Sequence, residues 1–590
     1  MLTAPKYLDI VSKRGQQGKP LERVYRLIRQ PEVLQMAYMN LYANPGATTV
    51  GADPQDTVDG MSLKRIDDLA EELKSGKFKW KPARRVYIQK ANGQLRPLGI
   101  PGWKDKMVQE AMRLILSAYY EPQFSTFSHG FRPTRSCHTA LNQVSKTWTA
   151  TKWFIEGDIK GCFDHIDHEI LMTLLARNIR DDRFLKLVRQ MLSVGYLEDW
   201  RYHQTYSGTP QGGVISPLLA NIYLHELDEF VEHKLIPAYT AGDRRRKRNP
   251  AYWKIEWEMR KARTEGDRKR ARSLDAQRKK LPYYDPQDPD YRRLRYIRYA
   301  DDFLLGFTGP KHEAEEIKQQ LATFLREHLK LELSGEKTLV THATTEAARF
   351  LGYEIRVVAN SGNRKRDGNV MLRVPRDVRT KWIARYLHKG KTAPKLGLVN
   401  HNEYDIVMTY RAAFDGIVNY YALAVNVGVL NDLKYVMKQS LVKTLAQKLK
   451  IRAKKVYRRY STTRDGYKVI EVAIPREGKR PLVATFGNKP CRWTKHPLPV
   501  QDVEVRHHTR RTELLKRLVA EGCELCGKPG EVEVHHIRKL SDLVHKWQGR
   551  TKPEWVKRMI EIRRKTLVVC RECHQAIHAG RYDGNKLTME

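Results

Sequence analysis

The 590-residue chain carries 108 lysines and arginines against 67 aspartates and glutamates, a formal net charge of +41. Hydrophobic residues make up 41% of the chain, enough to bury several cores, so the composition argues against wholesale disorder. A positive surplus of this size indicates a polyanionic partner, nucleic acid in preference to an anionic membrane surface. The sequence has no stretch of about 18 apolar residues and no apolar N-terminal segment, so we expect neither a transmembrane helix nor secretion.

The first 360 residues divide into two predicted parts. Residues 1–80 form an N-terminal extension of mixed polar and helical pattern, with a loop rich in glycine, aspartate and proline at 44–60. Residues 81–360 alternate strand-like and helix-like segments, which is typical of an α+β domain. Inside a basic insertion at 233–293, residues 244–280 include sixteen basic and five acidic residues. We expect this segment to be a solvated helical or disordered insertion, or alternatively a contact for nucleic acid.

The following segments are helical and basic. In residues 361–460 apolar side chains recur at three- and four-residue steps, which predicts helices with one buried face. The clearest stripe consists of Ile406, Tyr410, Phe414, Ile417 and Tyr421. Lysines between such stripes indicate a helical bundle with a basic exterior. Residues 461–515 are basic and contain aromatic residues but few strand signals, so we expect a linker or a small nucleic-acid-binding module.

Two adjacent aspartates, Asp301 and Asp302, lie in a segment, 295–305, that has the pattern of strand, tight turn and strand. Neighbouring carboxylates at a hairpin tip repel each other, and a shared cation relieves that repulsion. A third carboxylate, Asp158, ends an apolar strand-like segment. Together the three would hold two Mg²⁺ ions, one to activate a primer 3′-hydroxyl and one to stabilise the departing pyrophosphate. Taken alone, the Tyr-Ala-Asp-Asp tetrapeptide fits a helix cap or an ordinary turn equally well.

Other motifs accompany these carboxylates in a fixed order. A glycine-rich turn at 208–213 precedes Ser216 and Pro217, a pair typical of a helix start. The ordered set resembles the reverse transcriptases encoded by group II introns, and the resemblance runs along nearly the whole chain. The other matching segments are 96–101, 129–133, 333–338 and 350–353. The resemblance implies a multidomain α+β protein: a right-hand polymerase with fingers and palm in 81–360, a helical thumb or maturase domain X in 361–460, and a basic DNA-binding region in 461–515.

The resemblance also implies roles for single residues. Asp158, Asp301 and Asp302 would be the metal-binding carboxylates of the palm. Phe163 would exclude a ribose 2′-hydroxyl and so select deoxynucleoside triphosphates. The basic helices of domain X would bind the intron RNA and the primer–template duplex mainly by shape and phosphate contacts.

The fingers and the adjoining loop supply further expected contacts to the incoming nucleotide. Gln211 would line its sugar and phosphate. Lys90, with Arg84 or Arg85, would grip the triphosphate, and the sequence does not decide between the two arginines. Each of these cations can also be read as an ordinary surface charge.

The last segment, 516–590, contains two C-x-x-C pairs, which in a non-secreted chain predict a zinc site. Its cysteines are Cys523, Cys526, Cys570 and Cys573. Between the pairs, alternation at 531–537 predicts a strand bearing His535 and His536. His574 and His578 lie four residues apart, on one face of a short helix. Such a strand and helix can bring histidines to one cation; the other interpretations are a purely structural zinc module that binds DNA and a mixed site that uses His574.

This segment resembles an HNH, or ββα-metal, nuclease with a structural zinc site beside it. The resemblance implies that His536 is the general base, a role that suits histidine because its pKa lies near neutral pH. His535, His574 and His578 would hold Mg²⁺ or Mn²⁺ against the scissile phosphate. The sequence departs from the motif at Thr566, which occupies the position where the motif usually has asparagine. This puts the loop-ordering role of that position in doubt.

The sequence specifies neither the intron, nor the DNA target, nor the oligomeric state. Our hypothesis for the whole chain is an enzyme that binds its group II intron RNA, assists splicing, nicks double-stranded target DNA and primes reverse transcription from the nick. It would work in the bacterial cytoplasm or in an organelle. The alternatives are an RNA-binding splicing cofactor with dispensable enzymatic domains and a mobile-element polymerase unrelated to introns. The intact carboxylates and His536 favour the enzyme, and the domain X-like helices and the tail favour the intron.

Overall fold

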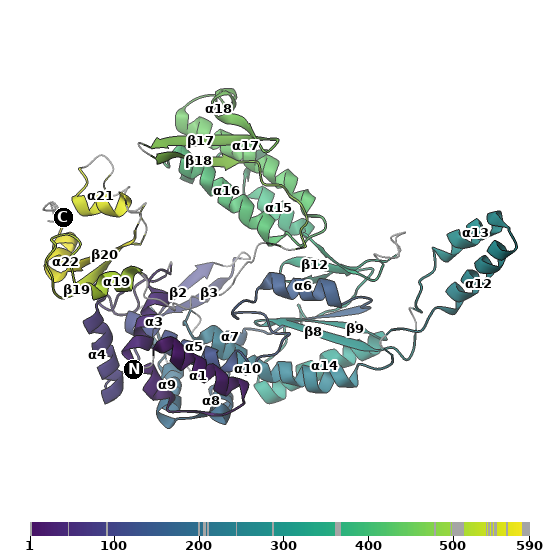
Figure 1. Cartoon of the computed structure of the whole chain (residues 1–590), viewed down its shortest axis with the longest axis horizontal. Coiled ribbons are helices and arrows are strands. Elements are labelled where there is room, and N and C mark those ends of the chain that lie inside the picture. Colours follow the sequence, from purple (N-terminus) through teal and green to yellow (C-terminus); the bar gives the residue numbers. More distant parts are fainter. Residues whose placement is uncertain are drawn as a thin grey trace.

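The computed structural model describes residues 3–580 apart from short gaps. The gaps are 45, 90–92, 199–200, 204–207, 209–211, 244, 286–287, 360–366, 477–478, 496, 498–512, 539, 541–542, 544–546, 548–550 and 562–563. Figure 1 shows N-terminal helices, a central sheet with a helical unit above it, and a C-terminal module beside the N-terminal helices. Two predicted site residues, Lys90 and Gln211, lie outside the described residues.

The N-terminal extension is helical, and its helices share a core with a long helix of the next domain. They are α1 (Ala4–Gln16), α2 (Val24–Ile28), α3 (Pro31–Leu41), α4 (Leu63–Ser75) and, beyond the extension, α5 (Trp103–Tyr120). The Ser62 side chain accepts a hydrogen bond from the Arg65 amide and so caps α4, while Gly76 ends that helix with a φ of 74°. The buried stripe of α4 faces this core and consists of Ile66, Leu69, Ala70 and Leu73.

The expected fingers hairpin is part of a four-stranded sheet in the order β3-β2-β6-β7. Strands β2 (Ala83–Gln89) and β3 (Leu95–Ile100) are antiparallel, and β6 (Tyr196–Glu198) and β7 (Arg201–His203) extend the sheet. The connecting elements are α6 (Cys137–Thr147), α7 (Cys162–His165), α8 (His168–Asn178), α9 (Asp182–Ser193) and α10 (Ser216–Phe230), with a short parallel pair, β1 (Leu21–Glu22) and β5 (Ile179–Arg180).

The central sheet, expected as the palm, has the order β10-β4-β9-β8. Its strands are β4 (Trp153–Asp158), β8 (Arg293–Tyr299), β9 (Asp302–Thr308) and β10 (Val340–His342), and they confirm the strand, turn and strand predicted around Asp301. Neighbouring side chains point to opposite faces, so Ile155 joins the core below the sheet and Phe154 the core above it. Helix α14 (Lys311–Leu329) packs below, and α6 and β13 (Val370–Arg373) lie above (Figure 1).

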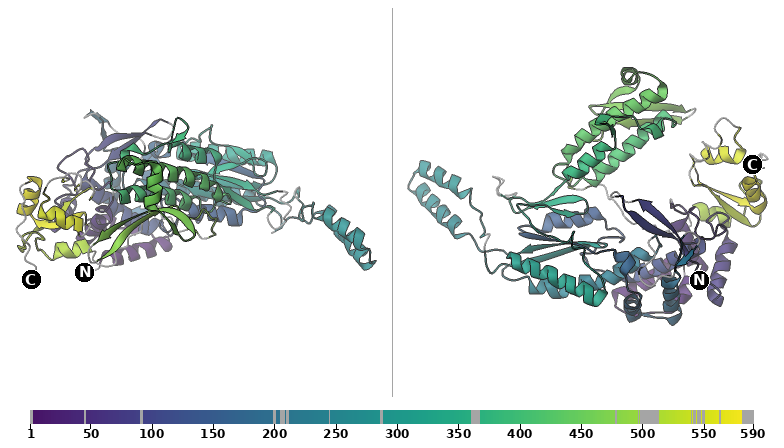
Figure 2. Two further views of the ribbon diagram at one scale, coloured as in Figure 1. Left: turned by 90° about the horizontal axis from the view of Figure 1, so that it is seen from above. Right: turned by 180° about the vertical axis from the view of Figure 1, so that it is seen from behind.

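The basic insertion is a helical hairpin of α12 (Pro250–Thr264) and α13 (Arg268–Arg278). A small cluster of Met259, Ala262, Ala271 and Leu274 holds its two helices together. The hairpin extends away from the rest of the molecule in all three views (Figures 1 and 2). The helical form of the expected insertion is therefore confirmed. A π-helical turn (Val231–Leu235) and α11 (Ile236–Ala238) lead into the hairpin.

The helices expected in residues 361–460 are present, and the apolar stripe from Ile406 to Tyr421 is buried as predicted. They are α15 (Arg376–Ala384), α16 (Glu403–Tyr420), α17 (Leu430–Leu449) and α18 (Ala453–Tyr460), and they share a core with β11 (Ala348–Phe350), β12 (Tyr353–Val357) and β13. Shorter elements are β14 (Leu387–His388), β15 (Lys391–Thr392) and 3₁₀ turns at Leu396–Leu398 and Val427–Val429.

The prediction that residues 461–515 are poor in strands was wrong. Strands β16 (Ser461–Arg464), β17 (Tyr467–Arg476) and β18 (Lys479–Phe486) form an antiparallel sheet. The sheet packs on α16, and Phe486 lies against the rings of Tyr410 and Phe414. The prediction gave more weight to the basic composition of the whole segment than to the alternation of apolar residues along β17. That alternation was sufficient, because a half-buried strand needs only every second residue to be apolar.

The C-terminal module has the expected antiparallel strand pair and helix. Strands β19 (Val532–His536) and β20 (Thr566–Cys570) pair with His536 opposite Thr566, and α22 (Arg571–His578) follows. Helices α19 (Glu513–Val519) and α21 (Glu554–Glu561) complete the described part. The module packs on the N-terminal extension: Val534 forms an antiparallel bridge with Met61, and Val532, Val534 and Leu518 join the N-terminal core (Figure 2).

Candidate functional site

The three predicted carboxylates meet at one end of the central sheet. Asp158, the last residue of β4, lies directly opposite Asp302, the first residue of β9, and Asp301 occupies the turn just before it. Ala300 in that turn has a φ of 56°, a left-handed conformation that lets the chain reverse tightly. Glycine is required at position 157, next to Asp158, because a Cβ at this position would lie 2.1 Å from the Phe303 ring. The fold therefore assembles the trio as the sequence predicted.

The electrostatics of this trio fit a cation site. Burial, then the charge of Asp301 and the contact with Asp158, raise the pKa of Asp302 to about 7, and burial also raises the pKa of Asp301. Positive charge already lies nearby, since the Lys337 ammonium donates to Asp158 Oδ2 over 2.7 Å and the charge of Arg96 offsets part of the rise in the pKa of Asp301. Carboxylate oxygens are the ligands that a hard divalent cation such as Mg²⁺ prefers, so the donor set fits such an ion.

Phe163 lies on the short helix α7, directly after the β4 strand and its carboxylate. Its ring makes an edge contact with Phe131, with ring centroids 6.3 Å apart. The glycine-rich loop reaches the same place: the Gly208 amide donates to Ile166 O, and a Cβ on Gly208 would lie 2.7 Å from Phe163 O. The structure thus brings the predicted aromatic wall and the start of the loop that contains Gln211 together.

The two candidate arginines of the fingers are held differently. Arg84 donates through Nε and Nη2 to the Val50 carbonyl, over 3.1 and 2.8 Å, and is tied to the N-terminal extension. The Arg85 guanidinium lies 3.4 Å from the centroid of the Tyr196 ring. The role of these arginines in gripping the triphosphate stays a prediction.

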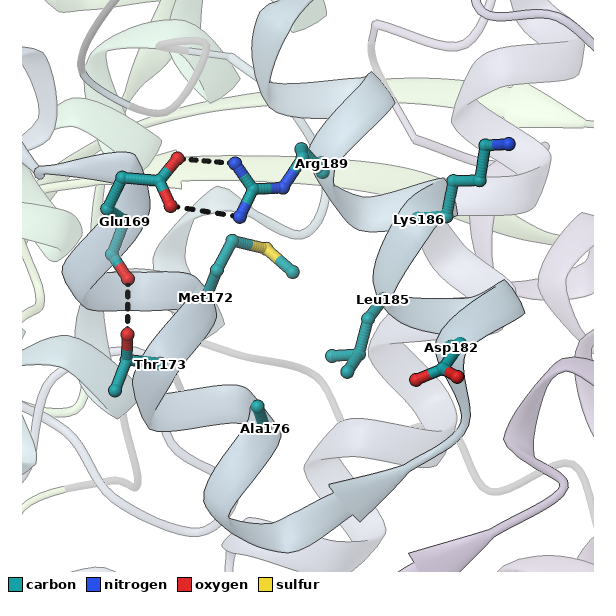
Figure 3. Close-up of a pocket in the computed structure, with 8 residues that line it drawn as sticks. All are labelled: Glu169, Met172, Thr173, Ala176, Asp182, Leu185, Lys186 and Arg189. Carbon is teal, nitrogen blue, oxygen red and sulfur yellow. Dashed lines mark hydrogen bonds and ion pairs between the residues drawn. The ribbon is translucent and has the colours of Figure 1, made fainter.

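A shallow hollow between α8 and α9 lies outside these constellations. Figure 3 shows that Arg189 reaches across it and donates to both carboxylate oxygens of Glu169, while Met172 and Leu185 line its floor. The exposed ion pair is explained by its position, because it links two neighbouring helices at the surface. This hollow contains none of the predicted site residues.

The four cysteines of the tail come together as predicted. Cys523 and Cys526 precede β19, Cys570 ends β20, and Cys573 lies on α22; their sulfur atoms all lie within 4.8 Å of one another. The Cys526 and Cys570 sulfur atoms are 3.7 Å apart. A tetrahedral zinc site with Zn–S bonds of about 2.3 Å has sulfur atoms about 3.8 Å apart. The donor set and its spacing therefore fit a structural zinc ion.

The predicted histidine ligands also converge, and a residue from the N-terminal extension joins them. Ligand atoms of His535, His574, His578 and Asp59 all lie within 4.8 Å of one another. The His574 Nδ1 atom lies 2.8 Å from Glu533 Oε2, which turns its Nε2 atom towards the cluster. His535 is only 5% exposed, and among the described residues neither of its ring nitrogens has a hydrogen-bond partner. A buried imidazole of this kind fits a metal ligand.

His536 lies on the opposite face of β19 from this cluster, because successive strand residues alternate. Its Nε2 atom is 3.1 Å from the Tyr38 hydroxyl, and its ring lies against Tyr38 and Tyr42. Burial lowers the pKa of His536 to about 3. The ring borders a pocket that is also lined by Arg517, Arg538, Arg564, Lys565 and Thr566, a basic surface beside the nuclease strands.

Comparison with known proteins places these sites in a family. Family models match for reverse transcriptase (RNA-dependent DNA polymerase) at residues 88–355, type II intron maturase at 377–478 and AI2M/AI1M-like HNH endonuclease at 523–574. The chain is 39% identical to the group II intron-encoded protein LtrA of Lactococcus lactis subsp. cremoris, over 97% of this chain and 98% of that protein.

The chain belongs to the group II intron-encoded proteins. It is also 33% identical to an uncharacterized 91 kDa protein in the cob intron of Schizosaccharomyces pombe, over 99% of this chain and 72% of that protein. A further relative is the putative COX1/OXI3 intron 1 protein of Saccharomyces cerevisiae, 32% identical over 94% of this chain and 69% of that protein.

This group II intron-encoded protein therefore combines reverse transcriptase, maturase and HNH endonuclease domains, as the sequence predicted. Reverse transcriptase and HNH domains use divalent metal ions, the first two domains imply binding of intron RNA, and the last implies a DNA substrate. The maturase match ends at residue 478, so it includes β16 and the whole of β17, two of the three strands that the sequence analysis missed. No helix in the described parts of the chain is long and apolar enough to cross a membrane.

Sequence reasoning missed several residues of these sites. Lys337 and Arg96 lie in segments that carried the family resemblance, so their sequence position did signal importance although no role was assigned to them. Asp59 and Tyr38 gave no such signal, because their partners in the nuclease lie more than 470 residues further along the chain. Only the packing of the tail on the N-terminal extension brings them into contact.

Proposed function

We propose that this reverse transcriptase copies intron RNA at a two-metal site held by Asp158, Asp301 and Asp302. The observation that carries the proposal is the direct pairing of Asp158 with Asp302 across β4 and β9, with Asp301 in the adjoining turn. Mg²⁺ ions bound there would activate the primer 3′-hydroxyl and neutralise the departing pyrophosphate. The carboxylates hold the ions, and Lys337 places a further positive charge beside Asp158.

Nucleotide selection in this proposal depends on the residues around α7. The Phe163 ring, supported by Phe131, closes the space that a 2′-hydroxyl would need. Gln211 lines the sugar and phosphate, and Lys90 with Arg84 or Arg85 contacts the triphosphate. The hydrogen bonds of Arg84 to Val50 O would have to be exchanged for phosphate contacts, whereas the Arg85 guanidinium lies over the Tyr196 ring.

The nuclease proposal divides the tail into two ion sites. Cys523, Cys526, Cys570 and Cys573 hold a structural zinc ion that supports the fold of the module. His535, His574 and His578 hold Mg²⁺ or Mn²⁺, which would polarise the scissile phosphate.

Two further residues belong to this nuclease site. His536 would activate water only after its ring leaves Tyr38 and turns from the opposite face of β19 towards the ion. Thr566, at the usual asparagine position, is bound by Arg517, which donates to the Thr566 carbonyl over 3.2 Å. That contact supports an ordering role for Arg517 in place of the asparagine.

The order of the reactions follows from the partners. The lysine-bearing helices of the thumb would bind the intron RNA, the tail would nick double-stranded target DNA, and the palm would extend the new 3′ end on the RNA template. The protruding hairpin α12–α13 offers a further basic surface for nucleic acid.

Primer extension by an Asp301→Ala variant tests the polymerase proposal. Loss of one ligand from a two-metal site should slow extension on an RNA template on the order of 10³-fold or more, with RNA binding unchanged. The matched control is Asp9→Ala, which removes an exposed carboxylate on α1. Near-normal extension by Asp301→Ala would exclude this carboxylate from the site.

A further inference from the structure

The N-terminal extension contacts the nuclease at the histidine cluster itself. The Asp59 carboxylate lies beside all three histidines: Oδ2 is 2.6 Å from His578 Nε2 and 3.2 Å from His574 Nε2, and Oδ1 is 3.5 Å from His535 Nδ1. Ligand atoms around one ion, with metal–ligand bonds of about 2.1 Å, are separated by about 3.0–3.4 Å. These separations are close to those of ligands that share a cation.

Backbone contacts hold Asp59 in this place. The His536 amide donates to Asp59 Oδ1 over 2.6 Å, the Gly60 amide donates to Val534 O over 3.0 Å, and the Val534 amide donates to Met61 O over 2.9 Å. Gly60 has a φ of 71°, which favours glycine and turns the chain into the bridge with β19. Residues 59–61 thus form a turn that ends in an isolated bridge to Val534 of β19, and this turn fixes the position of the carboxylate.

An ordinary ion pair does not account for the whole cluster. Asp59 can pair with His574 and His578, yet His535 is also buried in the cluster with no hydrogen-bond partner for either ring nitrogen among the described residues. An ion at the centre would satisfy all three histidines and the carboxylate together. This reasoning rests on the nuclease ion proposed above.

We propose that Asp59 is a fourth protein ligand of the nuclease ion, supplied by the N-terminal extension, and that the scissile phosphate must displace it. Mg²⁺ and Mn²⁺ prefer six ligands, so three histidines and Asp59 leave two positions open, but the Asp59 carboxylate lies against the three histidines where the anionic phosphate would reach the ion. The same extension engages His536 through Tyr38. The docked form is therefore the resting form of the nuclease, and target DNA opens it.

Mn²⁺ binding by the zinc-loaded full-length protein tests the ligand assignment. The polymerase ligands are first removed by Asp301→Ala and Asp302→Ala, so that the remaining Mn²⁺ signal reports the nuclease. In that background Asp59→Ala should weaken Mn²⁺ binding roughly tenfold or more. The control Asp53→Ala, on the same loop and paired with Lys81, should leave Mn²⁺ binding unchanged. Binding by Asp59→Ala that matches the parent would overturn the assignment.

A second variant separates this inference from the proposed ion site. If His574→Ala leaves Mn²⁺ binding intact, the nuclease ion lies elsewhere and the proposed function of the cluster fails. If His574→Ala loses Mn²⁺ and Asp59→Ala does not, only the inference fails.

Displacement is tested by nicking and by hydrogen exchange, both with the polymerase carboxylates intact. At saturating Mn²⁺, Asp59→Ala should nick target duplex roughly tenfold faster than the parent, because a charged contact no longer competes with phosphate. Adding target duplex to the parent should speed exchange of the Gly60 and Val534 amides. Slower nicking by Asp59→Ala at saturating Mn²⁺, or unchanged exchange on DNA binding, would contradict displacement.

Discussion

At the scale of single residues, sugar selection depends on one ring. Phe163 is positioned by its contact with Phe131 and by the close approach of Gly208 to its carbonyl. Phe163→Val should open space for a 2′-hydroxyl, so incorporation of ribonucleotides should rise by about tenfold or more while use of deoxynucleotides changes little. Steady-state kinetics with each triphosphate on one primer–template measures this ratio. Unchanged discrimination would place the steric wall elsewhere.

The structure brings predicted site residues together where their grouping follows from a local sequence pattern. Asp158, Asp301 and Asp302 were found because carboxylates at strand ends form a recognisable motif, and the structure brings them together. The four cysteines and the histidines of the tail were found from their spacing. Asp59 was not, because an aspartate in a polar loop is usually a turn residue, and its contacts with His574 and His578 arise only when two distant segments dock.

At the scale of elements, the tail depends on its cysteine site. Cys570 joins β20 to α22 and so links the zinc site to the helix that carries two histidine ligands. Cys570→Ser should lower zinc content to below one ion per chain and reduce nicking through local unfolding, because zinc binding contributes folding free energy there. Metal analysis and a nicking assay on the same preparation measure both effects.

The control for that variant is Cys491→Ser, a half-buried cysteine outside the cluster. It should keep zinc and nicking, and both variants should extend an annealed primer. Full zinc content in Cys570→Ser would mean that the four cysteines do not form the site.

The sheet of β16, β17 and β18 stabilises the thumb by packing on α16. Phe486 is 1% exposed and contacts Tyr410 and Phe414, so Phe486→Ala should destabilise this packing by about 3–5 kcal/mol. Hydrogen exchange of the β17 and β18 amides should quicken accordingly. Val483→Ala, on the same strand but 40% exposed, should leave exchange nearly unchanged. Equal effects of the two variants would argue against a packed sheet.

The same sheet shows why elements were predicted unevenly. Helices α16 and α17 carry long apolar stripes, whereas every residue of β16 is exposed and β17 has only a short alternating run. The hairpin turn at Asp465 and Gly466, with φ of 51° and 77°, is a local signal for a β-hairpin that the basic composition obscured. Charge identifies a nucleic-acid partner but does not distinguish a strand from a linker.

At the scale of the whole molecule, the polymerase and the nuclease are distinct sites on one connected body. The tail shares its apolar core with the N-terminal extension, which in turn packs on α5 beside the fingers (Figure 1). The sequence predicted the order of the domains but not this docking, because apolar faces on separate segments do not specify their partner. The module that would nick the target DNA is therefore attached to the same body that would extend the nicked end.

Target-primed copying tests the central claim most directly. The protein is mixed with its intron RNA, target duplex, Mg²⁺ and deoxynucleoside triphosphates, and nicked strand and extended strand are measured together. Asp301→Ala should nick but not extend. His536→Ala should fail to nick, yet extend a primer supplied as a pre-nicked duplex. Extension by His536→Ala on intact duplex, or nicking by it at the parental rate, would contradict the account.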